Sequence, residues 1–162
     1  MKNTVKLNEA QLREIIAESV KKVLQESDYK TYLWAAQQAK AKGDEARAQK
    51  FFNYAQQLYS QEFGNTNGED TQIRLGGKPG NYGACFGSDT LSVSPRQSGN
   101  ETVDGEYKVT QYGSQSNMNR SDMMGTMRNQ YPKSAQRYSN AENELSDFRN
   151  GKYTYNNGWK RN

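Results

Sequence analysis

Apolar and polar residues alternate with a helical period near the start of the chain. Between residues 9 and 26, leucine, isoleucine and valine recur three and four positions apart, and glutamate and lysine fall on the opposite side. Asn8 is a preferred N-cap, and Gln11 follows it at the spacing of a capping box. The pattern predicts an amphipathic helix over residues 9–26. Its apolar face consists of Leu12, Ile15, Ile16, Val20, Val23 and Leu24.

An apolar face of this width needs a cover. One interpretation is that it packs onto the two helices that follow, and the other is that it enters an apolar groove on a protein partner. A lipid surface is disfavoured, because residues 1–26 carry five basic and four acidic side chains and no aromatic residue. The pattern is also too short for a coiled coil, which needs three or four sustained heptads.

Two more helices are predicted in residues 29–62, joined by a tight turn. Asp28 and Asp44 stand at N-cap positions, and Gly43 suits the left-handed residue that ends a helix. Alanines allow the two helices to approach closely, and aromatic side chains supply the bulk between them. We therefore expect a helical hairpin here.

The amino-acid composition of the chain changes after residue 63. Thirteen of the fourteen glycines lie in residues 64–162, where Ile, Leu and Val together number only seven. So little aliphatic surface does not offset the entropy lost when the backbone is ordered. Aromatic residues recur among Asn, Ser, Gln and Gly, as in segments that stay disordered or order on another surface. Short helices are expected near 120–129 and 140–148, and a brief hairpin near 106–112.

The predicted fold class is mainly α. A small three-helix module over residues 1–63 contains the leader helix 9–26 and the hairpin 29–62, and a long, largely irregular polar tail over residues 64–162 follows it. Only 33% of all residues are apolar, glycine not counted, against roughly 45–50% in a globular chain with glycine included. The whole chain is therefore not expected to fill one core.

Candidate catalytic and metal-binding residues are few. The chain has no His and a single cysteine, Cys85, so the commonest general base and an internal disulfide are both missing. The stretch GGKPGNYGACFGS, residues 76–88, does not match the spacing of phosphate-binding loops and is interpreted as a flexible loop. Cys85 has no basic neighbour in sequence to activate it and is interpreted as an incidental thiol. We predict no enzymatic activity, no metal and no cofactor.

Aromatic and basic residues alternate toward the end of the chain, a combination that stacks on single-stranded nucleic acid. The net charge of +4 over 162 residues is small for a dedicated nucleic-acid binder. Contact with a protein surface is the other interpretation of this tail. The candidate contact residues are Arg137, Tyr138, Arg149, Tyr153, Tyr155 and Trp159.

Two resemblances accompany these patterns. Residues 6–24, K-L-x-E-x-x-L-R-x-I-I-x-E-S-V-x-x-V-L, resemble the leader helix of small uncharacterised proteins from crAss-like bacteriophages and gut bacteria. That resemblance implies an address or docking element and no activity. Residues 29–62 resemble a single tetratricopeptide-repeat hairpin, which implies that its faces need a cover. The positions that match are Tyr32, Ala36, Gly43, Ala48, Phe52 and Ala55.

The function predicted from these features is a non-enzymatic interaction or structural protein. It is expected to be an accessory or cargo component, docked through helix 9–26 to a protein of unknown identity in a larger assembly such as a phage virion. The alternative is a nucleic-acid-binding accessory factor that uses the tail. No apolar run approaches the roughly 20 residues that cross a bilayer, and residues 1–11 lack a secretory signal. We therefore expect a soluble protein, cytoplasmic or virion-associated, without membrane contact.

Overall fold

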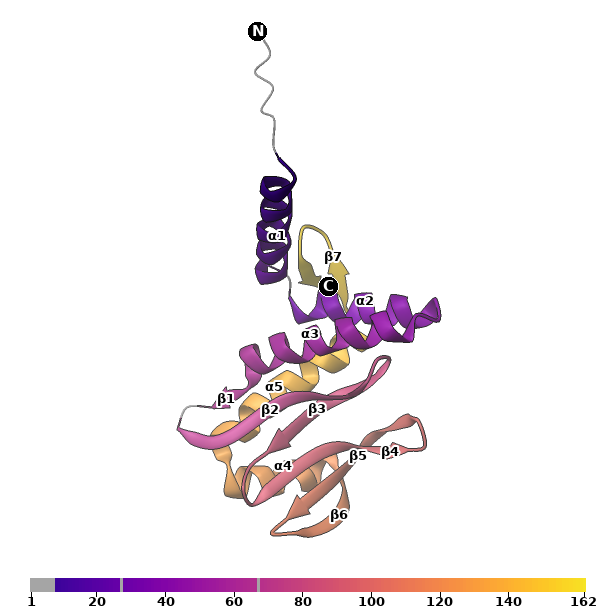
Figure 1. The fold of residues 1–162 in the computed structure, drawn as a ribbon. Coiled ribbons are helices and arrows are strands. Elements are labelled where there is room, and N and C mark those ends of the chain that lie inside the picture. The colour runs from indigo at the N-terminus through magenta and orange to yellow at the C-terminus, as the bar shows by residue number, and fades with distance from the viewer. Residues whose placement is uncertain (1–7, 27, 67) are drawn as a thin grey trace.

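The computed structural model describes residues 8–26, 28–66 and 68–162. In this part of the chain three helices come first, six strands follow, and two more helices precede a short hairpin at the end (Figure 1). In chain order the elements are α1 (Glu9–Glu26), α2 (Tyr29–Ala41), α3 (Glu45–Phe63), β1 (Asn65–Thr66), β2 (Glu69–Lys78), β3 (Asn81–Gly87), β4 (Leu91–Ser98), β5 (Glu101–Gln111), β6 (Ser114–Asn119), α4 (Arg120–Gln130), α5 (Pro132–Arg149), β7 (Tyr153–Tyr155) and β8 (Trp159–Arg161).

An antiparallel meander forms the centre of the fold. Strands β2 to β5 each pair with the next strand in the chain, so that the meander ends at β6, and the two-residue β1 extends the β2 edge. The register places Ile73 opposite Phe86, Phe86 opposite Val93, and Val93 opposite Val109. Residues that lie directly opposite each other share a face of the sheet. One face is therefore apolar from β2 to β5.

Helices cover that apolar face. α3 lies over β2, α5 lies over β2 and β3, and α4 contacts β5 and β6, while α2 packs against α3. Gln37 of α2 also donates to the hydroxyl of Tyr82 in β3, at 2.9 Å. Helix and sheet side chains form one continuous core, whose largest fully buried members are Tyr29, Tyr59, Tyr82, Tyr138, Phe52, Phe86, Leu33, Ile73, Leu75, Leu91, Met123 and Met127.

The mainly α fold class predicted from sequence is wrong, and so is the irregular tail. Helices and an antiparallel sheet make up a mixed α and β fold, in which residues 68–162 are ordered. The small number of Ile, Leu and Val residues after residue 63 led to the prediction of an irregular tail. Tyrosine, phenylalanine and methionine fill much of the core in their place. The hairpin over residues 29–62 is not an independent helical unit either, since α3 packs on the sheet.

The glycine-rich stretch 76–88 is not a flexible loop. It forms the end of β2, a turn and β3, with Gly77 paired to Tyr82 and Lys78 to Asn81. Gly77 and Gly80 both have positive φ, at 94° and 78°, as a tight turn requires. The glycines in this stretch thus serve a strand connection.

The predictions that rest on local sequence signals were more accurate than the prediction of the fold class. Asp28 accepts from the backbone N–H of Lys30, and Asp44 accepts from that of Arg47, so both cap helices as predicted. A helix does cover 120–129, and the hairpin expected near 106–112 is the longer β5–β6 pair. The helix expected near 140–148 begins earlier, at Pro132, because proline is favoured in a first helical turn.

Candidate functional site

The first candidate surface is the apolar face of α1. Its capping box forms as predicted: Gln11 N–H donates to Asn8 Oδ1 at 2.8 Å, and Asn8 N–H donates to Gln11 Oε1 at 3.1 Å. Leu12, Ile15 and Ile16 are 48%, 46% and 53% exposed. We call these three residues the α1 stripe. The side chains of Val20, Val23 and Leu24, predicted on the same face, lie outside the described residues.

The interpretation in which helix 9–26 covers the next two helices is wrong for the α1 stripe. The three side chains remain about half exposed, and α1 projects away from the sheet and its covering helices (Figure 1). α2 and α3 bury their inner faces against each other and against the sheet instead. The role of the stripe in partner binding stays a prediction.

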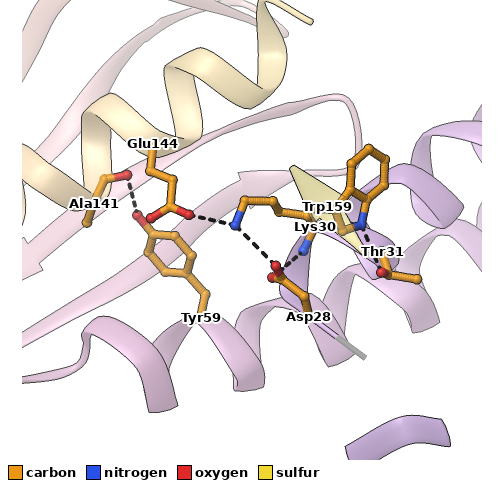
Figure 2. Close-up of polar contacts among 7 residues, drawn as sticks. All are labelled: Asp28, Lys30, Thr31, Tyr59, Ala141, Glu144 and Trp159. Atoms are coloured by element: carbon orange, nitrogen blue, oxygen red, sulfur yellow. Dashed lines mark hydrogen bonds and ion pairs between the residues drawn. The ribbon is translucent and has the colours of Figure 1, made fainter. Parts of the chain in front are cut away.

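A buried lysine at the start of α2 forms an ion pair with α5. Lys30 is only 4% exposed, and its Nζ lies 2.6 Å from Glu144 Oε1 and 3.1 Å from Asp28 Oδ2 (Figure 2). The ammonium group also lies 4.4 Å from the ring centre of Tyr29 and 5.0 Å from that of Tyr153. Burial lowers the pKa of Lys30, but the hydrogen bond and charges of Glu144 and Asp28 outweigh it and raise the pKa overall.

The second candidate surface is a cavity lined by aromatic rings. It has a volume of about 640 Å³ and lies between α2, the end of α5 and the β7–β8 hairpin. None of the described residues that line it carries a carboxylate. We call it the aromatic cavity; it is lined by Thr31, Trp34, Gln37, Phe148, Arg149, Gly151, Tyr153, Thr154, Tyr155 and Trp159.

The ring of Trp159 is held in place inside this cavity. Its Nε1–H donates to the hydroxyl of Thr31 at 2.9 Å (Figure 2). Phe148 meets the indole edge-on at 5.2 Å between ring centres, and Tyr155 does so at 5.4 Å. Tyr155 is also the direct cross-strand neighbour of Trp159. The wall of the cavity is therefore pre-organised rather than assembled around a ligand.

Two cations that neighbour the lining residue Tyr153, one in sequence and one in strand register, share one carboxylate. Asp147 accepts from Lys152 at 2.9 Å and also forms an ion pair with Arg161. The hydrogen bond from Lys152, with the charges of both cations, holds the pKa of Asp147 low despite the opposing effect of burial. Arg149 is positioned separately, because it donates to the carbonyl of Tyr82 at 2.9 Å.

Four of the six predicted tail contacts converge on the aromatic cavity. Arg149, Tyr153, Tyr155 and Trp159 all line it. The other two residues lie elsewhere and hold the fold together. Tyr138 is fully buried and donates to the carbonyl of Ala84 at 3.0 Å, and Arg137 donates to the carbonyl of Phe63 at 2.8 Å.

Trp34 is one lining residue that sequence reasoning missed. It is 51% exposed, on the solvent side of α2. A tryptophan on the polar side of an amphipathic helix was the available signal. Phe148 also lines the cavity and was missed, since its place depends on how α5 meets the β7–β8 hairpin.

A smaller cavity of about 260 Å³ lies between α5 and the β4–β5 hairpin. Burial raises the pKa of Glu142 in its wall to about 7, while the charge of Arg149 offsets part of the rise and that of Asp104 adds to it. Arg120 Nε donates to the same carboxylate at 2.9 Å. Its side chain is 43% exposed, so water screens its charge and burial dominates. One such carboxyl group does not define a reaction.

The remaining candidates for a reactive or metal-binding site have less support. Cys85 is buried, and burial raises the pKa of its thiol, which disfavours the reactive thiolate. Within the described residues, no group of three or more His, Cys, Asp or Glu side chains is placed to hold a metal ion. None of the helices in that part of the chain combines the length and apolar character that a bilayer crossing needs.

Comparison with protein families, with curated proteins and with solved structures found no match to this chain. The resemblances of residues 6–24 and 29–62 therefore stay predictions. These comparisons give no support to assembly into a virion.

Proposed function

We propose that this protein is a non-enzymatic interaction protein that docks onto a protein partner through the α1 stripe. The observation that supports the proposal is the exposure of Leu12, Ile15 and Ile16, at 46% to 53%, on one face of a helix that leaves the layered body. Isolated apolar residues on a surface are normal, but a contiguous apolar stripe is typical of an interaction site. A helix with this face binds in a partner's groove through anchors at i, i+3 and i+4.

The polar side of α1 indicates the character of the groove. In residues 8–18 it carries Glu9, Glu14 and Glu18 against a single cation, Arg13, which pairs with Glu9 at 2.6 Å. The complementary groove has an apolar floor, and basic side chains at the part of its rim that faces residues 9–18. Rim charges mainly orient and speed association, so most of the affinity comes from the stripe.

A photo-cross-linking scan along α1 tests the proposal. A benzophenone amino acid replaces one residue at a time in the full chain, at stripe positions 12, 15 and 16 and at control positions 10, 14 and 17. We expect one protein adduct from the stripe positions and none from the controls, which lie on the opposite side of the helix. Equal adduct yields from the stripe positions and the control positions would contradict the proposal that α1 binds in a groove.

A further inference from the structure

The aromatic cavity has a chemistry that docking through α1 does not use. We infer that this cavity binds single-stranded nucleic acid, with bases stacked on Trp34 and Tyr155 and phosphates held by Arg149 and Lys160. The inference is independent of the proposed function, because none of the α1 side chains that the structure describes lines the cavity.

Stacking surfaces are the first requirement, and the cavity offers two. Trp34 comes from α2 and is 51% exposed, while Tyr155 comes from β7 and is 64% exposed. Both line the same cavity, with Trp159 fixed beside them by Thr31. Any base can stack on such rings, since every base has a π-face. Trp159 is already fixed, so no rotamer entropy of that ring is lost when a base enters.

Positive charge is the second requirement. Residues 147–162 contain four cations, Arg149, Lys152, Lys160 and Arg161, and one carboxylate side chain, Asp147. Lys152 and Arg161 share Asp147, so that group keeps one positive charge. Arg149 adds a second charge in the cavity wall. Lys160 is exposed on β8 next to Trp159 and opposite Thr154, and it adds a third charge beside the cavity, outside its lining.

This combination favours a single strand over other occupants. An apolar peptide would gain from the rings but not from the surplus positive charge, whereas a phosphodiester chain gains from both. In a duplex, the base faces are covered by neighbouring bases and cannot reach Trp34. The volume of about 640 Å³ lies within the roughly 300–1,000 Å³ of ligand sites and leaves room for an unstacked base.

The test is fluorescence anisotropy with the full chain and a labelled oligo(dT) of about 12 nucleotides, within the usual site sizes of single-strand binders. We expect saturable binding that weakens steeply between about 50 and 200 mM salt. Unlabelled oligo(dT) should compete at least about tenfold better than dTMP or the matching duplex, because only the strand supplies several phosphates and open base faces. Absence of binding at low salt, or equal competition by the three, would overturn the inference.

Matched variants locate the site. Trp34→Ala should weaken binding about tenfold, and Trp34→Phe should retain most of it, because one base–aromatic stack is worth about 1–3 kcal/mol. Lys160→Glu should weaken binding and flatten the salt dependence. Lys108→Glu, an equal charge change at an exposed position on β5, should change affinity less. Circular dichroism shows whether each variant is folded. A folded Trp34→Ala with wild-type affinity, or equal effects of the two lysine variants, would contradict this placement.

Discussion

The indole N–H of Trp159 donates to the hydroxyl of Thr31 at 2.9 Å, which ties the last strand of the chain to the first turn of α2. Lys30 stands next to Thr31 and reaches Glu144 on α5. Two neighbouring residues of α2 therefore contact two separate elements, β8 through Thr31 and α5 through Lys30. The aromatic cavity lies at this junction, so its shape depends on these contacts.

Thr31→Val should loosen the β7–β8 hairpin. The substitution keeps the shape of the side chain but leaves the indole N–H of Trp159 without its acceptor, which costs about 1 kcal/mol. Urea unfolding measures the loss, and amide hydrogen exchange locates it in β7 and β8. Thr31→Ser keeps the hydroxyl and should retain most of the stability. If serine and valine destabilise equally, the hydrogen bond is not what holds the hairpin.

Lys30→Met should reduce the free energy of unfolding by about 2 kcal/mol, because Glu144 and Asp28 lose their shared cation. The side chains of these partners keep 26% and 36% exposure, so the cost stays below that of a fully buried pair. Lys50→Met, at an exposed position of α3, is the control and should lie within about 0.5 kcal/mol of wild type. Equal stability of the two variants in urea would show that the Lys30 cluster contributes little.

Gly77→Ala should destabilise the protein by about 1–3 kcal/mol. Gly77 has a φ of 94°, and a Cβ there would collide with the backbone carbonyl of Asn81. Gly87→Ala is the matched control, because a Cβ at Gly87 meets no atom within 4 Å among the described residues. Thermal unfolding compares the two. If both alanines are tolerated equally, residues 76–88 do not form the tight β2–β3 connection.

Signals carried by neighbouring residues predicted local structure well. Three helix starts were predicted from their caps, because a cap depends on atoms within a few residues. The capping residues are Asn8, which pairs with Gln11, and Asp28 and Asp44. The sheet could not be found in this way. Phe86 and Val93 read as isolated apolar residues in a polar tail, and their role in the core appears only when strand pairing places them on one face of the sheet.

The same limit applies to the candidate sites. The aromatic residues of the last strands were recognised because they cluster in sequence, whereas Trp34 lies more than a hundred residues earlier and joins them only through the fold. Tyr138 shows the opposite error. It belongs to the same aromatic and basic pattern, but its register on α5 points it into the core, where its hydroxyl meets the carbonyl of Ala84.

The raised pKa of Glu142 predicts a pH-dependent stability. Its pKa is about 7 in the folded protein and near its ordinary value when unfolded, so the folded state binds more protons between these values. The free energy of unfolding should therefore fall as pH rises from about 5 to about 7, and level off above that. Glu142→Gln should reduce this slope in urea unfolding at several pH values.

The comparison of wild type with Glu142→Gln isolates one group. Burial also raises the pKa of Glu62, which acts in the same direction and remains in both proteins. Asp147, whose pKa is held low, contributes at more acidic pH, where stability is lost as pH falls. An unchanged slope in Glu142→Gln would show that Glu142 does not titrate in this range.

Ile16→Asp should leave the stability of the protein nearly unchanged. The side chain of Ile16 is 53% exposed, and such surface positions usually change the free energy of unfolding by less than about 0.5 kcal/mol. Ala17→Asp introduces the same carboxylate one residue later, on the polar side of the helix. Thermal unfolding should place both variants close to wild type. A large loss in Ile16→Asp alone would mean that the stripe packs against the body of this chain.

The most direct test of docking through α1 is quantitative capture from native lysate with wild type, Ile16→Asp and Ala17→Asp as baits at equal concentration, read by mass spectrometry. The account predicts one saturable protein partner, retained by wild type and Ala17→Asp and reduced at least about tenfold by Ile16→Asp, as expected for loss of a central apolar anchor. The same partner at the same level on all three baits, or no saturable partner on any, would contradict docking through the α1 stripe.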